Sequence, residues 1–201
     1  MRERMVIGGL FAAGLAALAL LAVPLAPSHA QAADGPGPNL IIDVAGQTKG
    51  EIVIDLEPDV APEHVKRITE LARAGAYDGV VFHRVIQGFM AQTGDVEYGH
   101  HGGDTSRAGM GGSDRPDLKA EFSKRPFRRG TVGMARSNDP DSANSQFFIM
   151  FDDAPHLDGQ YTVVGHVIEG MDVVDRIKRG SGSQNGAVKD PDYMAKVTVK
   201  P

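Results

Sequence analysis

The chain has 201 residues, and none of them is cysteine. This absence excludes disulfide bonds, a thiol nucleophile, a cysteine-ligated zinc ion and a lipid anchor attached through cysteine. Two catalytic patterns are also missing: the Gly-x-Ser-x-Gly turn of serine hydrolases and the His-Glu-x-x-His pair of zinc peptidases. The sequence therefore disfavours a hydrolase.

An excess of positive charge is also lacking, because 21 lysines and arginines face 26 aspartates and glutamates, for a net charge of −5. A mildly acidic protein has no electrostatic reason to bind nucleic acid or an anionic membrane. One local basic run, Lys124-Arg125 with Arg128-Arg129, is typical of a solvated loop. The length is sufficient for one domain with a hydrophobic core.

The first thirty residues differ from the rest of the chain. A basic tip precedes an almost unbroken apolar run over residues 5–25, and small residues follow at Ala30 and Ala32. This pattern indicates a secretory signal peptide, cleaved after Ala30 or after Ala32. An uncleaved membrane anchor is the alternative, because the apolar run approaches the length that spans a bilayer. We predict a signal peptide over 1–30, a flexible linker over 31–38, a single domain over 39–201, and export to the periplasm.

Short runs of alternating polar and apolar residues dominate the remaining chain and predict β-strands. The segment 58–75 instead has apolar residues at helical spacing, and 171–179 fits a short helix. So many short strands in one small domain favour a sheet that closes on itself. We therefore predict a β-dominated fold, a closed eight-stranded antiparallel barrel with two α-helices. The predicted strands cover 40–44, 51–56, 80–86, 89–93, 131–134, 147–151, 161–167 and 195–199.

The most informative segment is 82–95, which reads Phe-His-Arg-Val-Ile-Gln-Gly-Phe-Met-Ala-Gln-Thr-Gly-Asp. An arginine among apolar strand residues is unusual, because a buried guanidinium needs partners. From this segment alone, Arg84 can equally be a structural arginine paired with an acidic side chain. Two later segments, Ser-Gln-Phe-Phe-Ile at 145–149 and Leu-Asp-Gly at 157–159, complete the pattern. Together these motifs resemble the cyclophilin family, and the resemblance covers roughly residues 39–200.

The resemblance implies an eight-stranded barrel capped by two helices and an enzyme that accelerates cis/trans rotation of X-Pro bonds. Its partners would be proline-containing unfolded or flexible segments of exported proteins, whose folding it would assist. By resemblance, Arg84 is the catalytic cation and Gln92 the side chain that steadies it. Because no covalent bond is broken, no nucleophile, metal or cofactor is expected. The positions that match substrate-binding residues of the family are Phe89, Met90, Gly109, Ala135, Arg136, Gln146, Phe148, Leu157 and Tyr161.

The sequence departs from the family pattern at several places, and two of these departures bear on ligand binding. His156 stands where well-known members carry a tryptophan that faces the drug cyclosporin, so we expect weak cyclosporin binding. The segment 96–107 is longer than in short members of the family. Its His100, His101 and Asp104 are potential metal ligands, but adjacent histidines on a glycine-rich loop are usually solvated, and we predict no metal site.

A binding module is the alternative to an enzyme: a domain of this family that grips proline-containing segments without turnover. Intact Arg84, Gln92 and Phe148 argue against it, because a pure binder has no need of the arginine. We expect a monomer without a nucleic-acid partner, in contact with a membrane only if the leader is retained.

Overall fold

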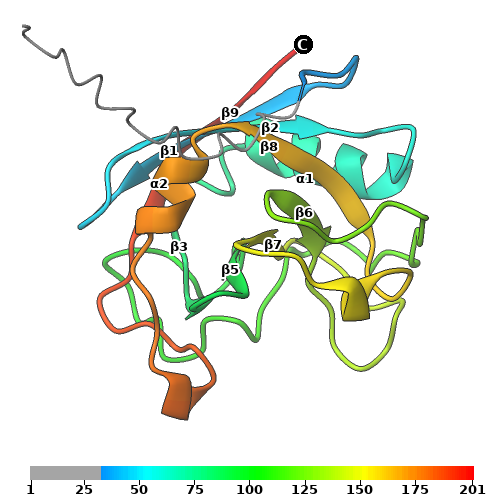
Figure 1. The fold of residues 1–201 in the computed structure, drawn as a ribbon. Helices are drawn as coiled ribbons and strands as arrows, with labels where there is room; N and C mark the ends of the chain where they lie inside the picture. Colours follow the sequence, from blue (N-terminus) through cyan, green and yellow to red (C-terminus); the bar gives the residue numbers. More distant parts are fainter. Residues whose placement is uncertain (1–32) are drawn as a thin grey trace, which may run out of the picture. The chain divides into compact units, whose positions relative to one another are not determined.

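The structure, a computed structural model, describes residues 33–201, so the predicted signal peptide lies outside the described residues. In that part of the chain nine strands form one antiparallel sheet in the order β3-β9-β1-β2-β8-β6-β7-β5-β4 (Figure 1). The strands are β1 (Asn39–Ala45), β2 (Gly50–Leu56), β3 (Val80–Val81), β4 (Arg84–Ile86), β5 (Met90–Thr93), β6 (Thr131–Met134), β7 (Phe147–Met150), β8 (Val163–Glu169) and β9 (Tyr193–Lys200). The helices are α1 (Pro62–Arg73) and α2 (Met171–Arg176), with single 3-10 turns at Pro155–Leu157 and Gly182–Gln184.

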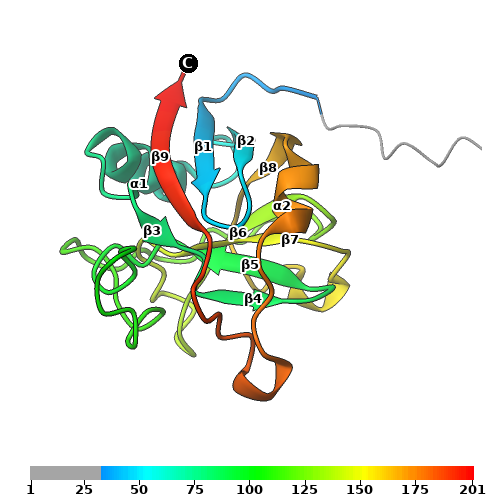
Figure 2. The ribbon, with the colours of Figure 1, turned by 90° about the vertical axis from the view of Figure 1, so that its left-hand side faces the viewer.

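The two edges of the sheet are neighbours along the chain. β3 and β4 stand at opposite ends of the strand order, yet only Phe82 and His83 separate them. The sheet must therefore curl until its edges meet, and Figure 2 shows β9, β1 and β2 above β5 and β4. The predicted β-dominated barrel with two helices is confirmed in this curled form.

One predicted strand, 80–86, is in fact two strands, which brings the count to nine rather than eight. The break has a physical cause, because the backbone N–H of Phe82 donates to the carbonyl of Asp192 and the carbonyl of His83 accepts from Val188. Both bonds connect Phe82 and His83 to the segment that precedes β9, so these two residues leave the ladder between β3 and β9 before β4 begins. Chain continuity rather than a β3–β4 ladder then joins the two edges.

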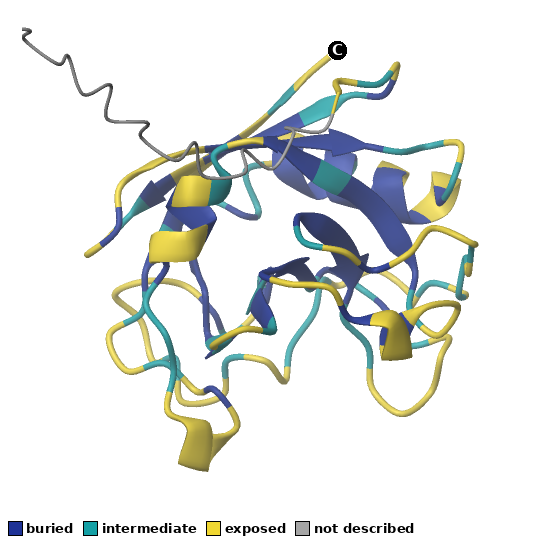
Figure 3. Ribbon diagram, in the orientation of Figure 1, coloured by how far each residue is buried: buried dark blue, intermediate teal, exposed yellow. Residues whose placement is uncertain are grey.

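The hydrophobic core fills the interior of the curled sheet. Figure 3 shows that the strands are mostly buried while the long connections are exposed. α1 covers this core with Val65, Ile68 and Leu71, the face that its helical spacing predicts. Burial of such a side chain stabilises the fold by about 1.5–3 kcal/mol. The ring of Tyr77 meets Phe147 edge to face, with 5.6 Å between centroids.

α2 is shorter than the sequence predicts. α2 ends at Arg176 rather than at 179 because the carbonyl of Arg176 accepts a hydrogen bond of 2.6 Å from the Thr48 hydroxyl. Ile177 then turns extended and is buried. Neither helix of residues 33–201 has the length and apolar character needed to cross a bilayer.

Candidate functional site

Four strands each place one residue along a single row of the sheet. Arg84 on β4 pairs with Gln92 on β5, Gln92 pairs with Phe148 on β7, and Phe148 pairs with Gly133 on β6. Residues directly opposite one another in antiparallel strands share a face. A turn with Gly88 at φ 70° joins β4 to β5 and sets the first pairing. The spacing in the sequence thus places a cation, an amide and an aromatic ring side by side.

Arg84 is half-buried and held by uncharged acceptors. Its Nη1 donates to Gln92 Oε1 at 3.1 Å, its Nε to the backbone carbonyl of Asn185 at 3.0 Å, and its Nη2 to Asn185 Oδ1 at 3.0 Å. Burial lowers the pKa of Arg84, but a guanidinium remains charged at any physiological pH. Within residues 33–201 no carboxylate forms an ion pair with this side chain. The charge of Arg84 is therefore left uncompensated.

A line of amides fixes the orientation of Gln92. Gln92 Nε2 donates to Gln146 Oε1 at 2.9 Å, and Gln146 Nε2 donates to the carbonyl of Gly111 at 2.8 Å. A backbone carbonyl only accepts, so it determines which end of Gln146 faces it, and Gln146 in turn orients Gln92. The result is that the oxygen of Gln92 faces the guanidinium of Arg84.

The buried carboxylate of Asp95 holds the loop that supplies Gly111. It accepts four backbone N–H groups at 2.7–3.1 Å, two on each oxygen. One of these belongs to Gly109, whose φ of +99° strains any other residue. A Cβ at Gly109 would also come within 3.1 Å of the His83 ring. Gly109 therefore acts by letting this loop lie against His83. The four donors are Glu97, Tyr98, Gly109 and Gly111.

An apolar cluster, which we call the apolar pocket, packs together on the same side of the molecule. Its centre includes Phe127, which the sequence reading missed and which stacks on Phe148 with 5.8 Å between centroids and 22° between planes. A Cβ at Gly133 would lie 2.6 Å from Phe127 and 2.7 Å from Phe148, so only glycine leaves room for this stack. The predicted residues in this cluster are Phe89, Met90, Ala135, Phe148, Leu157 and Tyr161.

Two charged or polar side chains border the apolar pocket. The guanidinium of Arg136 lies 4.3 Å above the ring centre of Tyr161 and donates to the carbonyl of Gln160. The exposed ring of His156 stacks on Phe89 with 5.8 Å between centroids. Both contacts cover the face of an aromatic ring and stabilise the border of the apolar pocket.

The histidines of the long loop have local structural contacts. His100 Nε2 lies 3.0 Å from the carbonyl of Val96, and the His101 ring stacks on Tyr193 with 3.9 Å between centroids. Asp104 accepts a hydrogen bond from the backbone of Ser106. Nowhere in residues 33–201 do three histidine or carboxylate side chains converge as a metal site would require.

The structure brings the predicted residues together in two halves. Arg84, Gln92, Gln146 and Gly109 belong to the polar half, and the remaining predicted residues form or border the apolar pocket. Asn185 is the second residue that the sequence reading missed. The only signal for it is the dipeptide Asn-Gly at 185–186, which is typical of a turn but carries no information about Arg84.

A curled antiparallel sheet that carries Arg84 beside an apolar cluster is typical of the cyclophilin class. The comparisons agree, since the family described as "Cyclophilin type peptidyl-prolyl cis-trans isomerase/CLD" matches residues 41–199. The chain therefore belongs to the cyclophilin-type peptidyl-prolyl cis-trans isomerases and is an enzyme of that activity.

Relatives and solved structures are consistent with this assignment. A probable peptidyl-prolyl cis-trans isomerase of Brucella suis is 56% identical over 188 residues, covering 92% of this chain and 94% of the relative. An isomerase of Helicobacter pylori is 41% identical over 136 residues, 66% of this chain and 77% of that protein. Cyclophilin AquaCyp293 of Hirschia baltica has a TM-score of 0.67 at 27% identity and covers 82% of this chain and 74% of its own. A Cryptosporidium parvum cyclophilin, crystallised in the presence of the dipeptide Ala-Pro, shares the fold with a TM-score of 0.69 at 23% identity over 81% of this chain and 99% of its own.

Proposed function

We propose that Arg84 accelerates X-Pro rotation by stabilising the twisted amide, while the apolar pocket holds the proline ring. Amide resonance sets the barrier to rotation at about 18–20 kcal/mol. As the bond twists, the prolyl nitrogen becomes pyramidal and regains a lone pair that neither planar isomer has. A fixed cationic donor that meets this lone pair binds the twisted state more tightly than either isomer and so lowers the barrier.

The single observation that carries this proposal is the uncompensated charge of Arg84. Its three contacts are to neutral oxygens of Gln92 and Asn185. An acidic partner would neutralise the guanidinium and weaken its interaction with the lone pair. Burial beside the apolar pocket strengthens the remaining interaction, because the local dielectric is lower than in water.

The apolar pocket supports the second part of the proposal. Met90, Phe148 and Leu157 are buried, and Phe89 and Tyr161 are half-buried around them. We infer that these apolar side chains receive the proline ring and exclude water from the rotating bond. Gln92 accepts a hydrogen bond from Arg84, and we infer from the family resemblance that it also contacts the substrate carbonyl.

Replacing Arg84 tests the mechanism. In a protease-coupled isomerisation assay on a proline tetrapeptide, we expect Arg84→Ala to lower kcat/KM by about 10²- to 10³-fold, the usual effect of removing one preorganised donor. Arg84→Lys keeps the charge but not the planar fork of donors. Its kcat/KM should therefore lie between the values of the wild type and of Arg84→Ala. Circular dichroism and Tm serve as controls for folding. Activity of Arg84→Ala within about threefold of wild type would contradict the mechanism.

We further infer that the substrates are exported proteins. The predicted signal peptide supports this inference through its basic tip, its apolar run and the small residues that follow. Cell fractionation with amino-terminal sequencing tests it, and the mature protein should begin at Gln31 or Ala33. Recovery of the intact chain in the cytoplasm would contradict export.

We also propose that cyclosporin binds weakly, because His156 replaces the indole donor of other members. We expect His156→Trp to tighten cyclosporin binding by about tenfold or more, equivalent to about one hydrogen bond. Catalysis should change little, because this ring lies at the edge of the apolar pocket against Phe89. Equal affinity of the wild type and His156→Trp would contradict the proposal.

A further inference from the structure

The turn 180–187 lies across β4 and reaches the guanidinium of Arg84. Asn185 contributes two acceptors to it, the backbone carbonyl to Nε and the side-chain oxygen to Nη2, both at 3.0 Å. We propose that Asn185 is a positioning residue for the isomerase reaction, which fixes the plane and direction of the Arg84 guanidinium without compensating its charge. This inference rests on the proposed function of Arg84.

The backbone conformation of Asn185 makes the two contacts possible. Its φ of 52° and ψ of 36° lie in the left-handed region, which asparagine adopts more readily than other residues with a side chain. In this conformation the carbonyl and the side-chain amide of one residue turn toward the same guanidinium. Asn185 directly follows the 3-10 turn Gly182–Gln184, which sets its place in the chain.

The turn is fixed to the strand that carries the arginine. The N–H of Val85 donates to the carbonyl of Gly186 at 2.8 Å, and the N–H of Gly180 donates to the carbonyl of Val85 at 2.9 Å. A Cβ at Gly186 would lie 2.5 Å from the Ile86 side chain, so the turn and the strand are in direct contact. Main-chain hydrogen bonds of Gly180 and Gly186, which lie before and after Asn185 in the sequence, therefore hold Asn185 next to Arg84.

The contacts leave the guanidinium with free donors. Arginine has five N–H groups in a rigid fork, and three of them are occupied by Asn185 and Gln92. In the described part of the chain, this leaves one N–H on each terminal nitrogen for a substrate. A carboxylate at position 185 would keep the geometry but would pair with the cation. The amide of Asn185 therefore positions the Arg84 guanidinium without neutralising its charge.

Two substitutions that tolerate the left-handed conformation test this inference. Asn185→Asp keeps an acceptor and adds a charge, and we expect it to lower kcat by about 10- to 100-fold with a smaller change in KM. Asn185→Gly keeps the backbone acceptor and loses the side-chain acceptor, so its loss should be smaller, about 3- to 10-fold. Asp190→Gly is the matched control, because Asp190 also has a positive φ of 49° and is not among the hydrogen-bond partners of Arg84 in residues 33–201.

A spectroscopic measurement separates positioning from a general structural role. In ¹⁵N-labelled protein the Arg84 guanidinium signals, identified by their absence in Arg84→Lys, report rotation about the Nε–Cζ bond. Asn185→Gly should accelerate this rotation, whereas Asp190→Gly should not, and Tm should change by less than about 2 °C in both.

Two results would overturn the inference: wild-type kcat in Asn185→Asp, or unchanged guanidinium rotation in Asn185→Gly. If Arg84→Ala is inactive while Asn185→Asp is fully active, the role of Asn185 fails and that of Arg84 stands. If Arg84→Ala itself is active, the proposed function fails, and the inference fails with it.

Discussion

His83, the neighbour of the proposed catalytic arginine, is a buried imidazole. It is 8% exposed, and neither ring nitrogen reaches a partner in the described residues, although Gln146 lies nearby. Burial lowers its pKa to about 4, against an opposing effect from the Asp95 carboxylate. The imidazole is therefore neutral in the folded protein at physiological pH.

This depressed pKa predicts a loss of stability in acid. A histidine that titrates near 6.5 when unfolded and near 4 when folded takes up its proton preferentially in the unfolded state, so stability falls as the pH drops from about 6.5 to about 4. Between pH 7 and about 4.5, we expect this residue to remove about 2–3 kcal/mol from the free energy of unfolding. Urea unfolding of the wild type and of His83→Gln at both pH values measures the difference. Equal losses in the two proteins would show that His83 does not titrate in this way.

Residues that belong to a continuous motif could be predicted, and isolated ones could not. The characteristic spacing of Arg84, Gln92 and Phe148 along two short segments allowed them to be grouped, and the structure places them on neighbouring strands. Phe127 lies within a basic run that reads as a solvated loop, and only its stack on Phe148 shows its role. Asn185 acts through a backbone angle and a contact 101 residues away in sequence. No local pattern encodes such a contact.

At the scale of single elements, α1 depends on a distant residue to complete its amino-terminal end. The residue before the helix is Ala61, which provides no side-chain cap. The carboxylate of Glu121 instead accepts from the backbone N–H groups of Glu63 and His64 at 3.2 and 3.1 Å and contacts His64 Nδ1 at 2.6 Å. A negative charge at this position also interacts favourably with the helix dipole.

Removal of this distant cap should weaken the fold. We expect Glu121→Ala to lower the free energy of unfolding by about 1–3 kcal/mol, because backbone donors and the buried His64 ring lose their acceptor. Glu121→Gln should lower the free energy of unfolding by less, since its amide oxygen still accepts a hydrogen bond. Glu63→Ala is the control, because this exposed residue on the first turn should cost less than about 1 kcal/mol. Urea unfolding curves provide the comparison, and equal effects of Glu121→Ala and Glu63→Ala would contradict the capping role.

Helices and strands could be predicted where the local sequence pattern alone determines them. The amphipathic spacing of 58–75 correctly indicated α1, and the alternation of 51–56 indicated β2. The predictions failed where a tertiary contact overrides the local pattern, as at Phe82 and His83, whose backbone bonds split one expected strand into two. α2 likewise ends early because Thr48 binds its last carbonyl.

At the scale of the whole molecule, the sheet is assembled from contacts that are remote in sequence. β1 pairs with β9 over its full length, so that the first strand of the domain lies beside the last. A strand-rich sequence predicts that the sheet curls, because open edges are unfavourable. It does not specify which strands are neighbours, since the registers depend on packing between distant segments. The class of fold was therefore predictable and the strand order was not.

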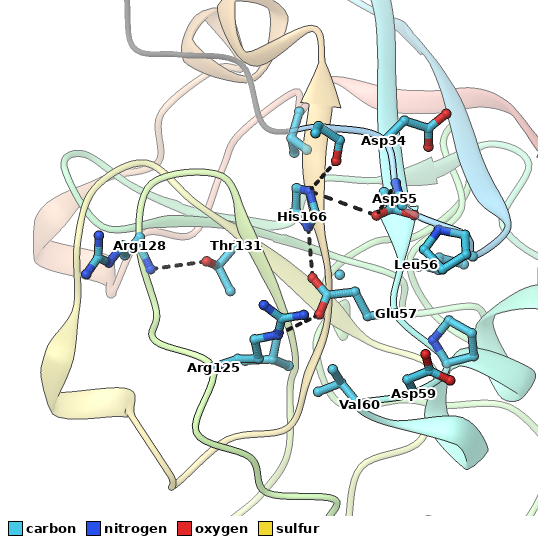
Figure 4. A pocket seen from close by; sticks show the side chains of 18 of the residues that line it. Asp34, Asp55, Leu56, Glu57, Asp59, Val60, Arg125, Arg128, Thr131 and His166 are labelled. Atoms are coloured by element: carbon cyan, nitrogen blue, oxygen red, sulfur yellow. Dashed lines mark hydrogen bonds and ion pairs between the residues drawn. The ribbon is translucent and has the colours of Figure 1, made fainter.

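The segment before β1 is part of this assembly. The N–H of Gly35 donates to Asp55 Oδ2 at 3.1 Å, and His166 Nε2 lies 3.3 Å from the carbonyl of Ala33. His166 Nδ1 lies 2.9 Å from Glu57 Oε1. These groups line a groove of about 540 Å³ beside β2 and β8, and Figure 4 shows His166 in it next to Asp55 and Glu57. Both ring nitrogens of His166 face acceptors, an arrangement that only the doubly protonated imidazolium satisfies.

The ionisation of His166 and Glu57 determines the pH range in which the segment before β1 is held against the sheet. The hydrogen bond with Glu57 raises the pKa of His166 above 6.5, so its stabilising effect is complete below 6.5 and is lost as the pH rises through the folded value. The same bond lowers the pKa of Glu57 below 4.5, so the stabilising effect of Glu57 is present above 4.5 and is lost in acid. Burial raises the pKa of Asp55, so the ionisation of Asp55 destabilises this region as the pH rises. The pair therefore stabilises the segment most between 4.5 and 6.5.

Hydrogen exchange of the Gly35 amide should report the release of this segment. In the wild type we expect its protection factor, corrected for intrinsic exchange, to fall by about two- to tenfold between about pH 6 and pH 8.5, the effect of one lost hydrogen bond. His166→Asn cannot titrate and should show no such step, while the contribution of Asp55 is common to both proteins. The amide of Ile54, inside β2, is the control and should remain protected throughout, because its strand is paired on both sides. A protection factor of Gly35 that is constant from pH 6 to 8.5 would show that the segment is held without the imidazolium, and that the contacts of Gly35 and Pro38 with β2 suffice.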